Sequence, residues 1–262
     1  MTRLPVMGAV MLLLCDVGNT TTVVGLWDVD HVDRRWRIST DRDRTADESR
    51  LLLRSMLAEH GGPVTGGALS SVVPPRTEAW REAMGALIEG PLIVVGPGVK
   101  TGIALAVDNP REVGADRVAN AIGAQRQFGA PVIVVDFGTA TTVDLVGPDG
   151  SYRGGAIAPG LEVSADALVT HTAALRRVEL SAPRSPVGRS TVEAIQSGLI
   201  YGYAGLVDGL VGRIMGTLDV TCPVVATGGL ATVMIGFTTA VTALEPDLTL
   251  IGLAEVYARN ES

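Results

Sequence analysis

The chain has 262 residues and a formal net charge of −7, and 47% of its residues are hydrophobic. This length suits one large domain or two ordinary ones, and the composition excludes a disordered chain. The acidic balance argues against a general nucleic-acid binder, because such proteins carry a basic face. Two cysteines are too few for a disulfide framework or a zinc site, so we expect buried free thiols.

The N-terminal stretch MTRLPVMGAVMLLLC imitates a short signal peptide. However, Leu14 stands before Cys15, where a cleavage site needs a small residue, and Pro5 and Gly8 interrupt the apolar run. No segment reaches the about 18 uninterrupted apolar residues that a membrane span needs. We therefore expect a cytoplasmic protein in which residues 1–10 form a flexible leader, with no membrane partner.

The first half of the chain predicts alternating strands and helices. Apolar runs predict strands at 11–16, 22–27, 68–73 and 92–95, and helical spacing predicts helices at 47–60, 77–87 and 113–128. Thr45 or Asp47 would cap the first helix, and the charged segment 41–48 is expected to be a loop entering it.

The second half restarts the same pattern. Strands are predicted at 131–136, 143–146 and 223–227, and helices at 161–175, 190–215 and 251–259. Pro148-Asp149-Gly150 is a hairpin signal, and the Gly/Pro-rich segment 154–160 is expected to be a loop. Strands alternating with helices indicate an α/β fold.

One short string occurs twice. DVGNTTTV at Asp16–Val23 returns 120 residues later as DFGTATTV at Asp136–Val143, identical at five of eight positions and flanked by apolar strands both times. The repeat predicts two similar domains, 11–120 and 121–262, with a ligand cleft between them. Chance similarity between two Gly/Thr turns is the alternative.

The repeated turn has the chemistry of a metal–phosphate site. Glycine lets the backbone approach a ligand, and successive N–H groups in such a turn can bind an anion. An aspartate there would repel bare phosphate but suits Mg²⁺, which one or two carboxylates hold together with phosphate oxygens. Two facing copies could hold a nucleoside triphosphate. Alternatively, each Asp and Thr merely caps its own hairpin.

A third motif is GADR, Gly114–Arg117, at the start of a predicted helix. Asp116 could act as a general base beside the cationic Arg117, although a carboxylate in the first helical turn is also favoured by the helix dipole alone. Other nucleotide and metal motifs are missing. GPGVKTG around Lys100, the sole lysine, is not a P-loop, and neither G-x-G-x-x-G after a strand nor H-E-x-x-H occurs.

From about Leu12 onward the chain resembles one family, type III pantothenate kinase. The resemblance rests on an ordered set of motifs: DVGNTTT (16–22), Lys100-Thr101-Gly102, DNPREVGADR (108–117), DFGTATT (136–142), GGAIAPG (154–160), GRST (188–191), ATGGLA (226–231) and LTLIGL (248–253). It implies the superfold of actin, hexokinase and Hsp70, built from two ribonuclease-H-like domains. It also implies ATP-dependent phosphorylation of pantothenate to 4′-phosphopantothenate, the first step to coenzyme A, by a homodimer.

The resemblance also implies roles for individual residues. Asp116 would accept the proton, Asp16 would lie near Mg²⁺, and Asp136 would hold the monovalent cation, K⁺ or NH₄⁺. ATP would be bound by the first turn and three residues of the second half: Asp16, Val17, Gly18, Asn19, Thr20, Thr21, Thr22, Val23, Thr139, Gly228 and Gly229. Pantothenate would be bound by Gly114, Ala115, Asp116, Arg117 and Thr191.

Two positions depart from the family pattern. Val107 stands where many relatives carry an aromatic residue that packs on the substrate, and Arg176-Arg177 replaces a Leu-Pro pair.

Two rival interpretations remain open. The same family includes members described as accessory factors for transcription, and such a protein could keep the fold and lose the activity. The chain could also be another kinase of the superfold, one that phosphorylates a sugar or acetate.

Overall fold

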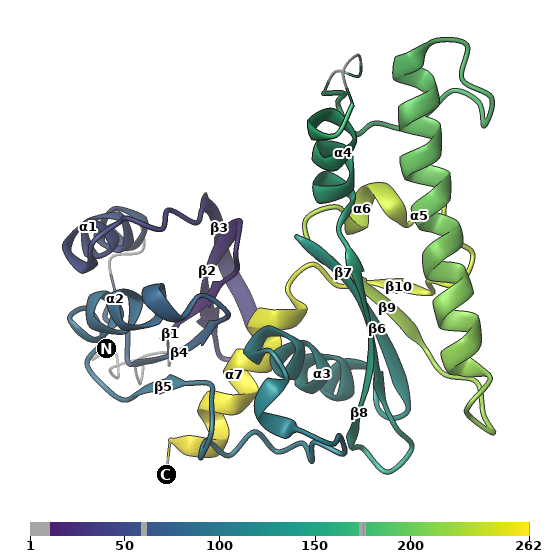
Figure 1. The fold of residues 1–262 in the computed structure, drawn as a ribbon. Coiled ribbons are helices and arrows are strands. Elements are labelled where there is room, and N and C mark those ends of the chain that lie inside the picture. Colours follow the sequence, from purple (N-terminus) through teal and green to yellow (C-terminus); the bar gives the residue numbers. More distant parts are fainter. Residues whose placement is uncertain (1–10, 59–61, 173–174, 176, 262) are drawn as a thin grey trace, which may run out of the picture. The chain divides into compact units, whose positions relative to one another are not determined.

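The computed structural model describes residues 11–58, 62–172, 175 and 177–261, so the predicted leader, 1–10, lies outside the described residues. The chain divides into two compact units (Figure 1). Unit 1 comprises the chain up to Ile103, Asn109–Gly123 and the residues from Asp247 onward; unit 2 comprises Ala104–Asp108 and Ala124–Pro246. The predicted domain ranges stay a prediction, and the units differ from them in placing the last helix in unit 1.

Unit 1 is built on a five-stranded sheet in the order β3-β2-β1-β4-β5. β1, β2 and β3 form an antiparallel meander, while β4 and β5 run parallel to β1. The strands are β1 Met11–Val17, β2 Thr21–Asp28, β3 His31–Ser39, β4 Gly66–Ser71 and β5 Leu92–Val94. The helices are α1 Ala46–Leu57, α2 Pro74–Gly85, the start of α3 (Ala115–Phe128), α7 Leu248–Asn260 and the short η1 Pro110–Glu112.

The alternation of side chains along β1 divides the two faces of this sheet. Leu13, Cys15 and Val17 point into a core with residues of α1 and α2, such as Leu53 and Met84. The opposite face is covered by α7, whose Tyr257 lies so close to Gly66 of β4 that a Cβ there would overlap its ring. Asp16 therefore lies on the α7 face.

Unit 2 repeats this topology in the order β10-β9-β6-β7-β8. β6, β7 and β8 are antiparallel neighbours, and β9 and β10 are parallel to β6 as β4 and β5 are to β1. Its elements are β6 Val132–Phe137, β7 Ala140–Val146, β8 Tyr152–Pro159, β9 Val224–Thr227, β10 Ala243–Leu244, α4 Leu161–Thr170, α5 Thr191–Met215 and α6 Ala231–Met234. The predicted α/β fold with duplicated halves is confirmed.

Three local predictions were wrong or incomplete. Residues 154–159 of the segment predicted as a loop belong to strand β8. Gly155 serves close approach there, since a Cβ on it would overlap the backbone of Val143 on β7. Strand β3 was not predicted, since four charged residues (Asp33, Arg34, Arg35 and Arg37) obscure its alternation. Helix α4 ends at Thr170, not at 175.

Caps and turns were predicted better. Thr45 caps α1 in a capping box with Glu48, and Gly150 closes the predicted hairpin by donating its N–H to Gly147 O at 2.9 Å.

Cys15 is buried and Cys222 is half-buried, and both are free thiols. Burial raises the pKa of the Cys15 thiol well above its usual value. Among the helices of the described segments, none is long and apolar enough to cross a membrane.

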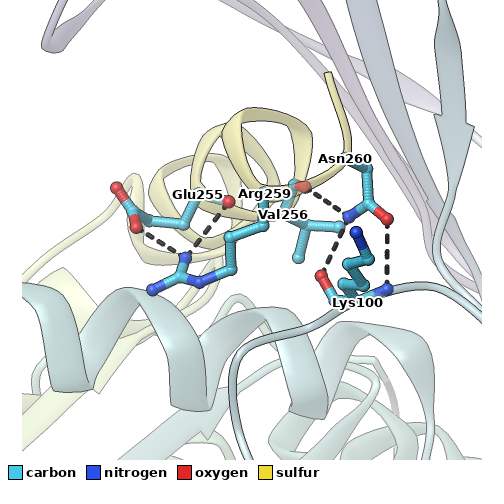
Figure 2. A network of polar contacts seen from close by, with 5 residues as sticks. All are labelled: Lys100, Glu255, Val256, Arg259 and Asn260. Atoms are coloured by element: carbon cyan, nitrogen blue, oxygen red, sulfur yellow. Dashed lines mark hydrogen bonds and ion pairs between the residues drawn. The ribbon is translucent and has the colours of Figure 1, made fainter. Parts of the chain in front are cut away.

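The end of α7 holds the loop that follows β5 (Figure 2). The side-chain amide of Asn260 bonds both backbone groups of Lys100, accepting its N–H at 3.1 Å and donating to its carbonyl at 2.9 Å. Asn260 also bonds Val256 O, and Arg259 pairs with Glu255 one turn earlier. The sole lysine is thus fixed through its backbone, while its side chain is exposed.

Candidate active site

The first turn lies where β1 passes into β2. Asp16 is half-buried near the end of β1, opposite Val23, and the tip formed by Asn19, Thr20 and Thr21 is exposed. The N–H of Gly18 donates to Thr21 O at 3.1 Å, which closes the tip. An exposed tip with backbone N–H groups and hydroxyls can bind an anion.

Thr40, the residue after β3, holds this turn. Its hydroxyl donates to Gly18 O at 2.8 Å, its N–H donates to Thr20 O at 2.9 Å, and it accepts a bond from the buried Thr22 hydroxyl at 2.8 Å. Sequence reasoning missed Thr40. The available signal was the apolar alternation of Trp36 and Ile38, which would have identified β3 and placed Thr40 beside the turn.

The first turn and the GADR motif meet at the ends of β1 and β4. Val72 donates its N–H to Val17 O at 3.1 Å, and its side chain lies 3.5 Å from where a Cβ on Gly114 would stand. Ser70 of β4 is the neighbour of Asp16 in the sheet, so the two side chains point to the same face. The hydroxyl of Ser70 is buried and has no hydrogen-bond partner in the described part of the protein.

Gly114 and Asp116 form the start of α3. Gly114 O accepts the N–H of Val118 at 3.1 Å, and the Asp116 carboxylate accepts the N–H of Arg117 at 2.7 Å. The four residues Gly114–Arg117 are half-buried. A carboxylate at a helix N-terminus is favoured in its charged form, which is the form that accepts a proton.

The second turn lies between β6 and β7. Asp136 is half-buried opposite Thr142, Thr139 is exposed, and the N–H of Gly138 donates to Ala140 O at 3.1 Å. Gly160 packs against the backbone of this turn. Its N–H donates to Thr139 O at 2.9 Å, and a Cβ on it would overlap the carbonyls of Gly138 and Thr139.

Gly228 packs directly on the Asp136 carboxylate. It has a φ of +93°, and a Cβ there would overlap Asp136 Oδ1 and the backbone of Phe137. Leu230 N–H donates to Phe137 O at 3.2 Å, which fastens this loop to β6. Gly229 is exposed beside it. The loop of Gly228 and Gly229, which is predicted to bind ATP, therefore belongs to the surroundings of the second turn.

Asp208 of α5 anchors the segment that follows α6. Its carboxylate accepts the N–H groups of Thr239 and Ala240, each at 3.0 Å, and the Thr239 hydroxyl at 2.7 Å. Burial alone would raise the pKa of Asp208, but these three donors outweigh it and hold the pKa below its ordinary value.

A buried polar cluster lies next to the second turn. Asp144 accepts the Thr142 hydroxyl at 2.9 Å and the Tyr152 hydroxyl at 2.7 Å. The backbone of Tyr152 bonds Ala104 O and Ala106 N–H, both at 2.8 Å. The segment that leads to the predicted substrate motif is therefore fixed to β8. Sequence reasoning missed this cluster, because its members are spread over two strands.

Thr191, the remaining predicted substrate residue, is the exposed first residue of α5, and Ser190 caps the helix by accepting the N–H of Glu193 at 3.2 Å. The structure thus gathers the predicted residues into two groups. Unit 1 holds the first turn and Gly114–Arg117 at neighbouring strand ends. Unit 2 holds Asp136, Thr139 and Gly228 around the second turn.

Comparison with known proteins decides the family. A family model described as "Type III pantothenate kinase" matches residues 12–213. The chain belongs to the type III pantothenate kinase family. Proteins of that name from Frankia casuarinae and Streptomyces griseus are each 49% identical to this family member. These matches cover 95% and 96% of this chain and 100% and 99% of the relatives.

Two solved structures share the fold of this pantothenate kinase family member. Component A of (R)-2-hydroxyglutaryl-CoA dehydratase from Acidaminococcus fermentans matches with a TM-score of 0.56 at 14% identity, over 96% of this chain and 98% of its own. A polyphosphate/ATP-glucomannokinase from Arthrobacter matches with a TM-score of 0.51 at 17% identity, over 95% and 98%. At such low identity the likeness shows the fold alone.

The two departures from the family pattern have local consequences. The Val107 side chain lies 3.4 Å from where a Cβ on Gly154 of β8 would stand, so a valine fits against this glycine. Arg177 pairs with Asp166 of α4 at 3.3 Å through exposed side chains, a type of contact that adds little stability. Arg176 lies outside the described residues.

Proposed function

We propose that this protein phosphorylates pantothenate with ATP to give 4′-phosphopantothenate, the first step of coenzyme A synthesis. Membership in the pantothenate kinase family over nearly the full chain carries the proposal. The position of Val72 supports it, because its N–H bonds Val17 O in the predicted phosphate turn and its side chain lies near Gly114, two residues before the predicted base.

In the proposed reaction the terminal hydroxyl oxygen of pantothenate attacks the γ-phosphorus of ATP and the bond to the β-phosphate oxygen breaks, releasing ADP. Asp116 orients the hydroxyl and accepts its proton late, because the transition state of phosphoryl transfer is loose. Arg117 binds the pantothenate carboxylate, a pairing that guanidinium geometry favours. The remaining predicted substrate contacts are Gly114, Ala115 and Thr191.

The residues of the first turn fit a Mg-ATP complex. Mg²⁺ takes oxygen ligands and is held by one or two carboxylates together with phosphate oxygens; it would neutralise charge that develops on the phosphates. Asp16 offers the carboxylate, and Ser70 offers a buried hydroxyl with no protein partner in the described structure. No group of three or more His, Cys, Asp or Glu side chains within the described segments could hold a metal. A magnesium site that phosphate oxygens complete does not need three such side chains.

Asp136 fits a monovalent cation, K⁺ or NH₄⁺, beside the nucleotide. Its carboxylate lies between Gly138 and Gly228, and the Thr142 hydroxyl stands opposite it in the sheet. Thr142 gives its proton to Asp144, so its lone pairs stay available as a ligand. Thr139 would contact ATP from the same turn.

We also propose that the protein forms a homodimer through α4, α5 and the end of β8. Large apolar side chains are exposed there, and exposed apolar patches mark interaction surfaces. These side chains are Ile157 of β8, Val163 and Leu168 of α4, and Val192 and Tyr201 of α5. Val187 is exposed in the segment before α5. Light scattering during gel filtration should give the mass of two chains, and Val163→Glu with Leu168→Glu should give one. A monomeric wild-type protein would contradict this proposal.

The test of function is a coupled ADP-release assay with pantothenate, Mg-ATP and K⁺, followed by mass detection of phosphopantothenate. The Asp116→Asn variant should lower kcat by about 10²–10⁴-fold and keep the fold. Asp219→Asn, an exposed carboxylate after α5, is the matched control and should change nothing. No product from folded wild-type protein would remove the proposal and favour a silent accessory factor. Turnover of glucose or acetate instead would favour another kinase of the superfold.

A further inference from the structure

We infer that Tyr203 is a positioning residue for the second turn, acting through Pro159 and Gly160. This inference rests on the proposed function in one respect, namely that Thr139 contacts ATP. Tyr203 lies in the middle of α5 and carries none of the roles assigned so far.

The Tyr203 hydroxyl is the meeting point of three elements. It donates to Pro159 O at the end of β8 at 2.7 Å and lies 3.2 Å from Gly160 O, which precedes α4. Because its proton is given to these carbonyls, it accepts the bond from the Ser164 hydroxyl of α4. Tyr203 is only 9% exposed, so water has little access to replace its hydroxyl as the donor to these carbonyls.

Gly160 transmits this anchoring to the turn. Its N–H donates to Thr139 O at 2.9 Å, and its Cα fits against the carbonyls of Gly138 and Thr139, where a Cβ would overlap both. The preceding residue, Pro159, is paired with Ala140, the last residue of the turn. The position of Pro159 and Gly160 therefore sets the position of Thr139.

Removal of the hydroxyl would leave the Pro159 carbonyl without its only side-chain donor in the described structure. Pro159 and Gly160 would then shift to find another donor, and the Thr139 turn would lose its fixed support. Catalytic geometry is sensitive to shifts of this kind, because reacting groups must stay within a fraction of an ångström. We therefore expect loss of the Tyr203 hydroxyl to weaken the binding of ATP.

The experiment compares wild type with Tyr203→Phe, which keeps the ring. KM for ATP and the Kd of Mg-ATP from calorimetry should both rise about five- to tenfold, the size expected for one lost hydrogen bond. KM for pantothenate should stay within about twofold. The calorimetric Kd does not depend on pantothenate turnover, so failure of this inference is distinguishable from failure of the proposed function.

Two matched controls separate positioning from loss of stability. Asp219→Asn changes an exposed side chain just after the same helix, outside this cluster, so it should behave as wild type. Ser164→Ala removes a hydroxyl from the cluster but leaves the bond to Pro159, so its KM for ATP should also stay near that of wild type. Equal changes in both KM values for Tyr203→Phe, or a lower melting temperature with unchanged KM values, would overturn the inference.

A second measurement uses the wild type alone and covers the case in which Tyr203→Phe does not fold. Hydrogen exchange should slow on addition of Mg-ATP at the Gly160 amide and in 161–164, and it should also slow at 138–140. Protection confined to 138–140, with no change at Gly160, would show that the two segments are not linked and would contradict the inference.

Discussion

The two turns are similar in sequence but differ in length by one residue. In the first, Val17 pairs with Thr22 across a four-residue connection; in the second, Phe137 pairs with Thr141 across three residues. The partner of Asp16 is therefore Val23, while the partner of Asp136 is Thr142, one position earlier in the repeat. A slip of one residue changes which side chains share a face.

This slip gives the two aspartates different neighbours. Asp16 has an apolar side chain opposite it and the hydroxyl of Ser70 on the other side. Asp136 has the hydroxyls of Thr142 and Thr227 on its two sides, with Asp144 behind Thr142. An oxygen-rich setting suits a weakly hydrated monovalent cation, whereas one carboxylate suits Mg²⁺ that keeps its phosphate ligands. The register therefore gives the proposed unequal roles a physical basis.

The turns are closed by equivalent residues with different side chains. Thr40 follows β3 and donates its N–H to Thr20 O, and Gly160 follows β8 and donates its N–H to Thr139 O, both at 2.9 Å. In unit 1 the Thr40 side chain adds a second bond, to Gly18 O. In unit 2 the closing residue has no side chain, and Tyr203 supplies the anchoring from α5.

The largest effects are expected from the two carboxylates. Asp16→Asn should lower kcat by about 10²–10³-fold at every K⁺ concentration. The variant lacks the negative charge that would hold Mg²⁺ at the ATP phosphates. Asp136→Asn should instead make the residual rate insensitive to K⁺. Initial rates measured from zero to saturating K⁺ test this contrast. Identical K⁺ responses of the two variants would mean that the turns do not divide the ions.

A smaller effect is expected from the residue that closes the first turn. Thr40→Val keeps the shape but removes the bond to Gly18 O and leaves the buried Thr22 hydroxyl without its partner. The free energy of unfolding should fall by about 1–3 kcal/mol, measured by urea denaturation, and KM for ATP should rise. Thr170→Val, an exposed threonine at the end of α4, should change neither. Unchanged stability of Thr40→Val would show that the first turn does not depend on β3.

Much of this arrangement could be predicted from the sequence, because period and identity are local signals. Apolar runs located most of the strands, and the repeated string located both turns. The one-residue difference in register could not be predicted, because the same residue pattern is compatible with connections of three or four residues. The role of Tyr203 could not be predicted either, because it bonds backbone carbonyls, which leave no residue signature at the other end. Thr40 was missed together with strand β3. Strand β8 was mistaken for a loop because glycine serves close approach there as well as turns.

The smallest effect tests the register slip itself. Thr142→Val gives Asp136 the partner that Asp16 already has, and Val23→Thr makes the reverse change in the first turn. The K⁺ concentration for half-maximal rate should rise about three- to tenfold in Thr142→Val, the size of one lost polar contact, with kcat at saturating K⁺ nearly unchanged. Val23→Thr should leave the K⁺ response as in wild type.

Thr142→Ser controls for the loss of the methyl group and of packing, because it keeps the hydroxyl that donates to Asp144. It should retain the wild-type K⁺ response. If Thr142→Val and Thr142→Ser respond to K⁺ alike, the hydroxyl opposite Asp136 does not serve the cation. The difference between the turns would then lie in Gly138 and Gly228, which flank the Asp136 carboxylate, and not in the register.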